Sequence, residues 1–242
     1  MLQLQLTKKI LTISAILLSY PSYADTIGDI VEQTGIGNII REGNKIPSTD
    51  FPSINLYDEA ETGNGRMLIE FLDKEELALT EHTLVYIDEV YYDPNPDLSK
   101  MSMRMVMGTA RFASGKLGKM NKSNIAISTP TANIAINGTD FTTTIDELGR
   151  SLIILLPDAN GDASGSITVS NESGTDVVLE EAYQATMVST LNSYPTTPVV
   201  INNITPSLIN NMFIVSQPKD ISRVIEESAT ESNDGGILDV DF

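Results

Sequence analysis

The feature that most constrains the fold is a rhythm of short runs in which apolar and polar residues alternate between turns. In residues 66–72 the apolar positions are two apart, Asp73 and Lys74 suit a turn, and residues 77–79 resume the alternation. This period places successive apolar side chains on one face of a β-strand. Residues 151–156 are apolar almost throughout, which predicts a strand buried on both faces. Spacings of roughly eight to twelve residues predict an all-β fold, which could be a sandwich, a barrel or a solenoid.

Further strands are expected on both sides of these runs. Three short ones are predicted before residue 46, a loop-like stretch follows to residue 64, and Leu84, Tyr86 and Ile87 are expected to point inward from a later strand. The remaining predicted strands cover residues 29–32, 35–37, 38–41, 82–91, 124–128, 133–137, 139–145, 166–170, 176–180 and 184–189.

Every second residue between positions 101 and 107 is methionine. A strand would place all four thioethers, Met101, Met103, Met105 and Met107, on one face. Thioethers are ligands for Cu(I), but methionine is also an adaptable filler of hydrophobic cores. Phe112 follows closely, and we interpret the stripe as a core strand.

The charge balance excludes several classes of function. The 242 residues hold 15 Lys and Arg against 33 Asp and Glu, a net charge of −18 at pH 7. Nucleic-acid binding needs a basic excess, so a nucleic-acid partner is not expected. With no Cys and a single His, His82, neither disulfides nor thiolate or multi-imidazole metal sites can form. We therefore expect no cofactor.

The first 24 residues have the pattern of a secretory signal peptide. Lys8 and Lys9 precede an apolar run over residues 10–18, and small residues stand at Ser22 and Ala24. Nine residues are too few to cross a bilayer, and no later run reaches the ~20 needed. An uncleaved anchor or a buried first helix are the alternatives. We expect cleavage after Ala24 and secretion across the inner membrane, to the periplasm or cell surface, with no membrane span in the mature chain.

The pattern changes after Leu191. We expect an all-β domain over residues 25–191, followed over residues 192–242 by a linker, two short helices and an acidic tail. The helices are predicted at residues 206–213 and 218–228, each beginning with proline, which suits a first helical turn. From Glu226 to the end there are six acidic residues and no basic one.

Four segments together resemble FecR-type domains. Residues 128–141 read STPTANIAINGTDF, similar to the family's Thr-Pro, short apolar strand and Arg-Gly-Thr-x-Phe. Residues 68–73 (LIEFLD), 111–116 (RFASGK) and 155–174 resemble its other strands and turns, so the likeness covers about residues 28 to 190. Asn137 stands where the family commonly has Arg. The residues of the motif are turn-formers and core-formers, and Phe141 is expected to be buried.

The resemblance implies an exported all-β domain of short antiparallel strands, with a solenoid-like or sandwich-like build. In the best-known members the domain follows a transmembrane helix and a cytoplasmic sigma-factor-binding segment, and it relays the state of an outer-membrane transporter. We expect neither part here. Two hypotheses follow: a protein-binding or regulatory module that engages an envelope or outer-membrane protein, or a structural matrix or adhesion protein of the cell surface.

The sequence has no motif that clearly indicates catalysis, and we expect a protein that is not an enzyme. Acidic pairs such as Glu75-Glu76 could serve a glycosidase, but such pairs arise by chance in so acidic a chain and no aromatic subsites accompany them. Residues 158–162 (DANGD) offer oxygen ligands for Ca²⁺, yet the sixth and twelfth positions of an EF-hand-like loop are Ala163 and Val169. A polar turn between strands is the other interpretation.

Basic residues are concentrated between positions 100 and 124, a segment without acids. This stripe could attract an anionic partner, or it could pair with the protein's own acidic strands, such as the one carrying Glu70 and Asp73. We hypothesise binding through Lys116, Lys119 and Lys122, which lie in an expected loop. The six residues are Lys100, Arg104, Arg111, Lys116, Lys119 and Lys122.

Overall fold

A computed structural model describes residues 26–93, 95, 98–114 and 124–213. The expected signal peptide, the second expected helix and the acidic tail lie outside the described residues. Lys116, Lys119 and Lys122 also lie outside them.

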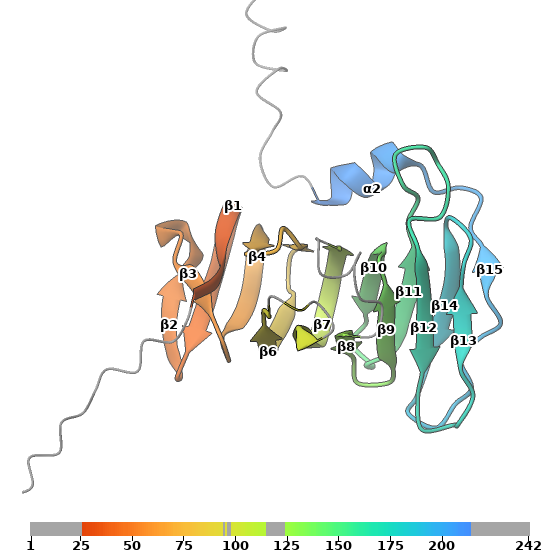
Figure 1. Ribbon diagram of the computed structural model, residues 1–242. Helices are drawn as coiled ribbons and strands as arrows, with labels where there is room; N and C mark the ends of the chain where they lie inside the picture. Colours follow the sequence, from red (N-terminus) through yellow and green to blue (C-terminus); the bar gives the residue numbers. More distant parts are fainter. Residues whose placement is uncertain (1–25, 94, 96–97, 115–123, 214–242) are drawn as a thin grey trace, which may run out of the picture.

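The regular secondary structure of the described residues is almost all β-strand, with one short C-terminal helix (Figure 1). This confirms the all-β, antiparallel class expected from the sequence. The elements are β1 (Thr26–Arg41), β2 (Asn44–Pro47), the 3₁₀ turn η1 (Ser48–Asp50), β3 (Ser53–Asn55), β4 (Glu59–Phe71), β5 (Glu76–Leu79), β6 (Leu84–Tyr91), β7 (Lys100–Ala113), β8 (Ile125–Ser128), β9 (Asn133–Asn137), β10 (Asp140–Ile145), β11 (Ser151–Leu155), β12 (Ser166–Ser170), β13 (Val177–Leu179), β14 (Gln184–Val188), β15 (Val199–Val200) and α2 (Pro206–Phe213).

The strands of the described residues form one sheet that is folded into two facing layers. β1, β4 and β7 are long enough to bend and contribute one half to each layer. Layer 1 runs in the order β3, β1, β4, β5, β7, β10, β11, β14, β15. Layer 2 runs in the order β2, β1, β4, β6, β7, β8, β9, β12, β13. All of these pairs are antiparallel except β7 with β8.

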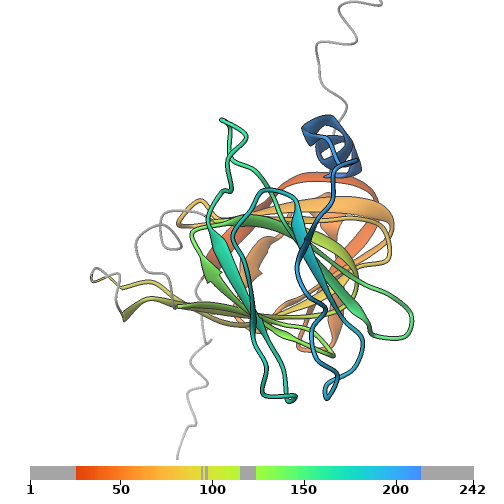
Figure 2. The same ribbon diagram turned by 90° about the vertical axis from the view of Figure 1, so that its right-hand side faces the viewer.

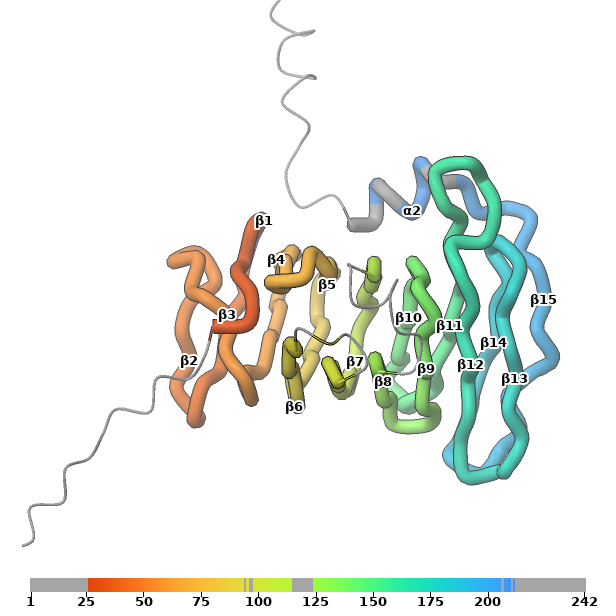
Figure 3. The backbone as a smooth tube through the Cα atoms, in the orientation of Figure 1, coloured from red at the N-terminus to blue at the C-terminus, as the bar shows by residue number. Residues whose placement is uncertain are grey.

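Seen end-on, the two layers wrap around a common axis (Figure 2). The tube view shows the strands standing in a row, from β1–β3 at one end to β13–β15 at the other (Figure 3). The main hydrophobic core lies between the layers, and its largest fully buried side chains include Phe71, Phe112 and Phe141. Phe141 is therefore buried as expected. β15 pairs with β14, so the sheet also includes residues after Leu191; the domain boundary at that residue stays a prediction.

The bend of β7 occurs at a glycine and resets the alternation of buried side chains. Gly108 has a φ of +91°, and a Cβ there would lie 2.3 Å from Thr83 Oγ1. Odd-numbered residues are buried before the bend, and even-numbered ones after it. Met101, Met103 and Met105 are accordingly in the core, while Met107 is 49% exposed. The prediction of a four-methionine core face was wrong at Met107, because the bend turns that side chain outward.

Other expectations near the N-terminus also need correction. The three short strands predicted there are one continuous strand, β1, whose bend lies at Gly35 with a φ of +66°. Much of the expected loop up to residue 64 belongs to β3 and β4. In β6 the inward residues include Val85 and Ile87, whereas Leu84 and Tyr86 are only half-buried, because pairing with Met105 and Met103 sets which face is covered.

Helix α2 covers part of the outer face of layer 1, and Figure 3 shows it running across the row of strands. Ile209 packs with Ala78, Ile154 and Leu156 in a second apolar cluster. Near the end of the helix, Arg66 Nη1 donates to the Asn211 carbonyl over 3.2 Å. Among the described residues, no helix has the length and apolar character needed to cross a bilayer.

Candidate functional site

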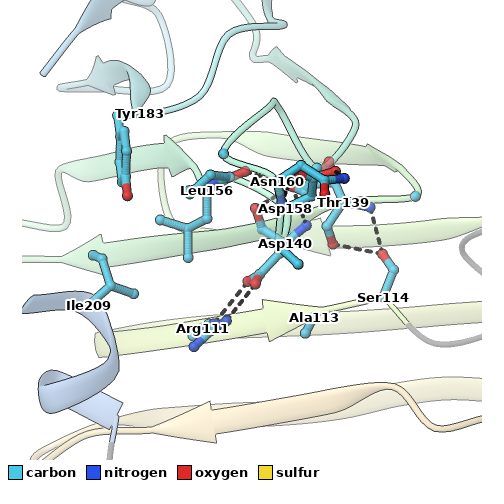
Figure 4. A pocket seen from close by; sticks show the side chains of 15 residues that line it. Arg111, Ala113, Ser114, Thr139, Asp140, Leu156, Asp158, Asn160, Tyr183 and Ile209 are labelled. Atoms are coloured by element: carbon cyan, nitrogen blue, oxygen red, sulfur yellow. Dashed lines mark hydrogen bonds and ion pairs between the residues drawn. The ribbon is translucent and has the colours of Figure 1, made fainter. Parts of the chain in front are cut away.

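A groove of about 840 Å³ opens beside α2, which we call the helix groove. Its lining comes from the end of β7, the start of β10, the loop at residues 157–164, Tyr183 and Ile209 (Figure 4). These segments are far apart in sequence. They meet because β7, β10 and β11 are neighbours in layer 1.

Arg111 and Asp140 form the polar floor of the helix groove. Arg111 Nε donates to Asp140 Oδ1 at 2.9 Å and Nη2 donates to Oδ2 at 2.6 Å, so the guanidinium and carboxylate meet as two forks (Figure 4). The hydrogen bond to Asp140 raises the pKa of the Arg111 guanidinium. Both groups are held in fixed orientations, each with one edge committed to the other.

The loop beside this pair is held by its own hydrogen bonds. The Asp158 carboxylate accepts from the backbone N–H of Asn160 at 2.8 Å and of Asp162 at 3.1 Å. The hydroxyl of Ser164 accepts from Asp140 N at 2.9 Å and lies 2.8 Å from the Leu156 carbonyl oxygen. Residues 158–162 thus form a polar turn, one of the two interpretations from sequence. No group of three or more acidic or histidine side chains in the described part of the chain could hold a metal ion.

The opposite wall of the helix groove is apolar apart from one hydroxyl. Leu156 and Ile209 are buried, and Tyr183 packs against the same cluster. Figure 4 shows the ring of Tyr183 pointing its hydroxyl to the side where Leu156 and Ile209 lie. That hydroxyl is buried, and within the described residues it finds no hydrogen-bond partner. Leaving such a group unpaired costs about 1–3 kcal/mol, a cost that a bound group with a complementary atom would relieve.

The basic stripe expected from sequence is only partly described. Ser114, the last described residue before Lys116, Lys119 and Lys122, lines the helix groove. Arg104 pairs with Asp88 at 2.9 Å, and Arg111 pairs with Asp140.

The two described arginines of the stripe thus pair with acidic strands of the protein itself, one of the two alternatives from sequence. The acids that balance the two arginines are on β6 and β10, the neighbours of β7 in the sheet. Glu70 instead pairs with Lys74, four residues away in its own hairpin. The order of the strands in the sheet determines which acid pairs with each arginine, and this order cannot be predicted from the local spacing of residues.

Glu75 is a buried acid, although from the sequence it is only one half of an acidic pair. Its side chain is 0% exposed, and neither carboxylate oxygen has a hydrogen-bond partner among the described residues. Burial, with a smaller contribution from Asp73, raises the pKa of Glu75 to about 9. Glu76 is exposed, so the two carboxylates do not form the catalytic pair that was considered. A polar residue at the start of an apolar strand was the only signal, and it is a weak one.

Residues 58–156 match the family described as FecR protein. They form a FecR domain. The helix groove is built partly from this FecR domain, which supplies Arg111, Asp140 and Leu156, and partly from the later residues Tyr183 and Ile209. The match confirms the resemblance over the middle of the chain.

The chain is similar to solved structures that include two crystal structures of a "putative anti-sigma factor from Parabacteroides distasonis". Each is 14% identical over 57% of this chain and 57% of that chain, with TM-scores of 0.42 and 0.41. The chain therefore spans little more than half the length of those structures. The comparison with curated proteins found no match.

The signature residues of the FecR domain have structural positions here. Pro130 lies in the turn between β8 and β9, and Gly138 takes a φ of +65° before β10. Asn137, at the position where the family commonly has Arg, donates to Ser166 Oγ at 3.2 Å, while its own amide oxygen is buried without a partner in the described residues. The motif thus shapes the turn that carries Asp140 into the helix groove.

Proposed function

We propose that this chain is an exported, non-catalytic FecR-domain module of the cell envelope that binds another protein through two parts of the chain. These are the helix groove and the segment with Lys116, Lys119 and Lys122 that comes after Ser114 in the sequence, here called the basic loop after its expected conformation. The observation that carries the proposal is the groove itself. It combines a fixed Arg111–Asp140 pair, an apolar wall and the buried hydroxyl of Tyr183, which has no hydrogen-bond partner among the described residues. An apolar surface with a few pre-positioned polar groups is the usual composition of a recognition site.

The orientation of the polar groups supports recognition rather than catalysis. Asp140 is tied to Arg111, and Asp158 to the backbone of its own loop. A general base needs a free lone pair, and a nucleophile needs an activated group such as a hydroxyl, and each must be able to reach an atom of the substrate. These carboxylates instead serve as a rigid frame that presents its edge to a partner.

The positive charge of the basic loop favours a partner with an anionic surface. Ser114 lines the helix groove, and Lys116, Lys119 and Lys122 come within the next eight residues of a chain that is otherwise strongly acidic. A local positive stripe on a negative body orients a charged partner and speeds encounter. The partner is an envelope or outer-membrane protein on this proposal, since we propose export by residues 1–24. N-terminal sequencing of exported material should begin at Asp25.

Affinity capture from envelope extracts tests the binding role. The parent, a triple reversal (Lys116→Glu, Lys119→Glu, Lys122→Glu) and a matched triple Lys→Arg control are compared at low and moderate salt. We expect the parent and the Lys→Arg control to capture one defined partner, and this capture should be weaker at moderate salt. The triple reversal to Glu should lose that partner. Capture that is indifferent to both the reversal and salt would remove the basic loop from the proposal. A parent that purifies only as large assemblies favours the matrix or adhesion role instead.

A further inference from the structure

A second groove, of about 870 Å³, lies at the other end of β10 and is here called the bend groove. It is lined by the turn at residues 81–82, the bend of β7 at residues 106–108 and the turn at residues 145–150. Asp140 and Ile145 are the two ends of β10, and a strand of this length spans about 17 Å. The bend groove is therefore a separate surface from the helix groove.

Two large apolar side chains stand exposed on the bend groove. Met107 is 49% exposed because the bend at Gly108 turns it out of the core. Leu148, at the tip of the β10–β11 turn, is 78% exposed. Exposed apolar side chains that gather at a groove are a common mark of an interaction site.

The turn that carries Leu148 is held rigidly. Gly149 N donates to the Asp146 carbonyl at 2.9 Å, and Arg150 Nε donates to the Asp146 carboxylate at 2.6 Å. Thr131 Oγ1 also donates to the Gly149 carbonyl at 3.3 Å, which ties the turn to the one between β8 and β9. Leu148 is thus presented outward by a structured turn, and this pre-organisation lowers the entropic cost of binding.

The charges around the bend groove are mainly acidic. Glu81, Asp146 and Glu147 line it together with His82 and Arg150. Glu81 is paired with Arg66 and Asp146 with Arg150. Glu147 is exposed and directly precedes Leu148. With the chain at −18 overall, a second copy would be repelled, whereas a cationic partner would be attracted.

We propose that the bend groove docks a cationic segment of a partner protein, which inserts an apolar side chain between Met107 and Leu148 and places Lys or Arg beside Glu147. This charge preference is opposite to that of the basic loop. The chain would then hold two different partner surfaces, and loss of one is separable from loss of the other.

Methyl NMR with ¹³C-labelled methionine tests the docking directly on the mature chain. The probe is the amidated pentapeptide Lys-Lys-Leu-Lys-Lys, compared with counterparts that carry Ser for Leu or Glu for Lys. We expect the Leu-containing cationic probe to cause a saturable shift of the Met107 ε-methyl signal. Binding of either counterpart, measured by the same signal, should be at least fivefold weaker. The buried Met101 methyl should not move.

Variants assign the effect to the groove. Leu148→Ser should weaken binding of the probe at least fivefold. Leu191→Ser, at an exposed leucine outside the groove, should leave binding of the probe unchanged. Unaltered methyl signals of Met101 and Met103 show that each variant is folded. The triple Lys→Glu reversal should not abolish the response. A Met107 methyl that does not shift, or that shifts equally with the Ser-containing probe, overturns the proposal.

Discussion

Phe112 and Phe141 face each other across β7 and β10, with ring centroids 5.9 Å apart and ring planes tilted by 44°. The register continues the row, since Leu77 lies opposite Phe112 and Leu155 lies opposite Phe141. All four side chains are at most 2% exposed. This row of four neighbouring strands forms the centre of layer 1 where it faces layer 2. The outward-facing residues of the same strands, Arg111 and Asp140, are positioned by it.

Replacing Phe141 by Ala is expected to lower the free energy of unfolding by about 3–5 kcal/mol, because it removes a fully buried ring and leaves a cavity beside Phe112. Urea denaturation measures the loss. Tyr194→Ala, at a 70% exposed aromatic, is the control and should change stability little. An unchanged denaturation midpoint for the Phe141 variant would place the ring outside the core.

Gly108→Ala should destabilise the fold far more than Gly161→Ala. The two glycines have nearly the same φ, +91° and +90°, so both variants carry similar backbone strain. Only at Gly108 would the new Cβ meet other atoms, Thr83 Oγ1 at 2.3 Å and Thr83 Cα at 2.5 Å, whereas nothing lies within 4 Å at Gly161. We expect about 1 kcal/mol at Gly161 and clearly more at Gly108, by thermal or chemical unfolding. Equal losses would mean that the β7 bend tolerates a side chain.

The local alternation of apolar and polar residues predicted the strands well where consecutive strands pair with each other as hairpins. The β4–β5 turn at Asp73 and Lys74, the burial of Phe141 and the helix at α2 were all expected, and the structure contains them. These features depend on neighbours within a few residues, which a sequence displays directly.

Features set by distant pairing were not predictable in the same way. The bend at Gly108 shifts the buried face of β7 by one residue, and a shift of one residue exposes Met107. The pairing of Arg111 with Asp140, and the helix groove built on it, needs β10 beside β7 rather than the hairpin order of the chain. Burial of Glu75 likewise follows from packing between elements, not from its immediate neighbours.

Glu75→Gln should flatten the pH dependence of stability. Because the folded pKa of Glu75 is about 9 against an ordinary 4.5, the folded state keeps a proton that the unfolded state releases between these values. The free energy of unfolding of the parent should therefore fall as pH rises, by up to about 1.4 kcal/mol per pH unit from this group. The variant should be the more stable at pH 8, and the gap should close toward pH 5.

The exposed neighbour supplies the control for this pH experiment. Glu76→Gln should keep the slope of the parent, because its carboxylate is solvated. Parallel stability curves for the parent and Glu75→Gln would show that Glu75 is ionised in the folded protein.

A double-mutant cycle on Arg111→Met and Asp140→Asn should give a coupling energy of about 1–3 kcal/mol, since the forked pair is mostly shielded from solvent. The same cycle on Arg104 and Asp88, whose side chains are 53% and 39% exposed, should give at most about 1 kcal/mol. Similar values for the two cycles would mean that the floor of the helix groove is no more rigid than the surface.

Site-specific photo-crosslinking in the living cell tests the central claim, that the helix groove is a protein-binding face. A photoreactive residue at Ala159, on the exposed loop of the groove, is compared with one at Glu172, exposed in the turn at the opposite end of β12. We expect a discrete crosslinked species from Ala159 and none from Glu172. The yield of the Ala159 species should fall when Arg111 is also replaced by Met. No crosslink at Ala159, or the same products from both positions, would contradict it.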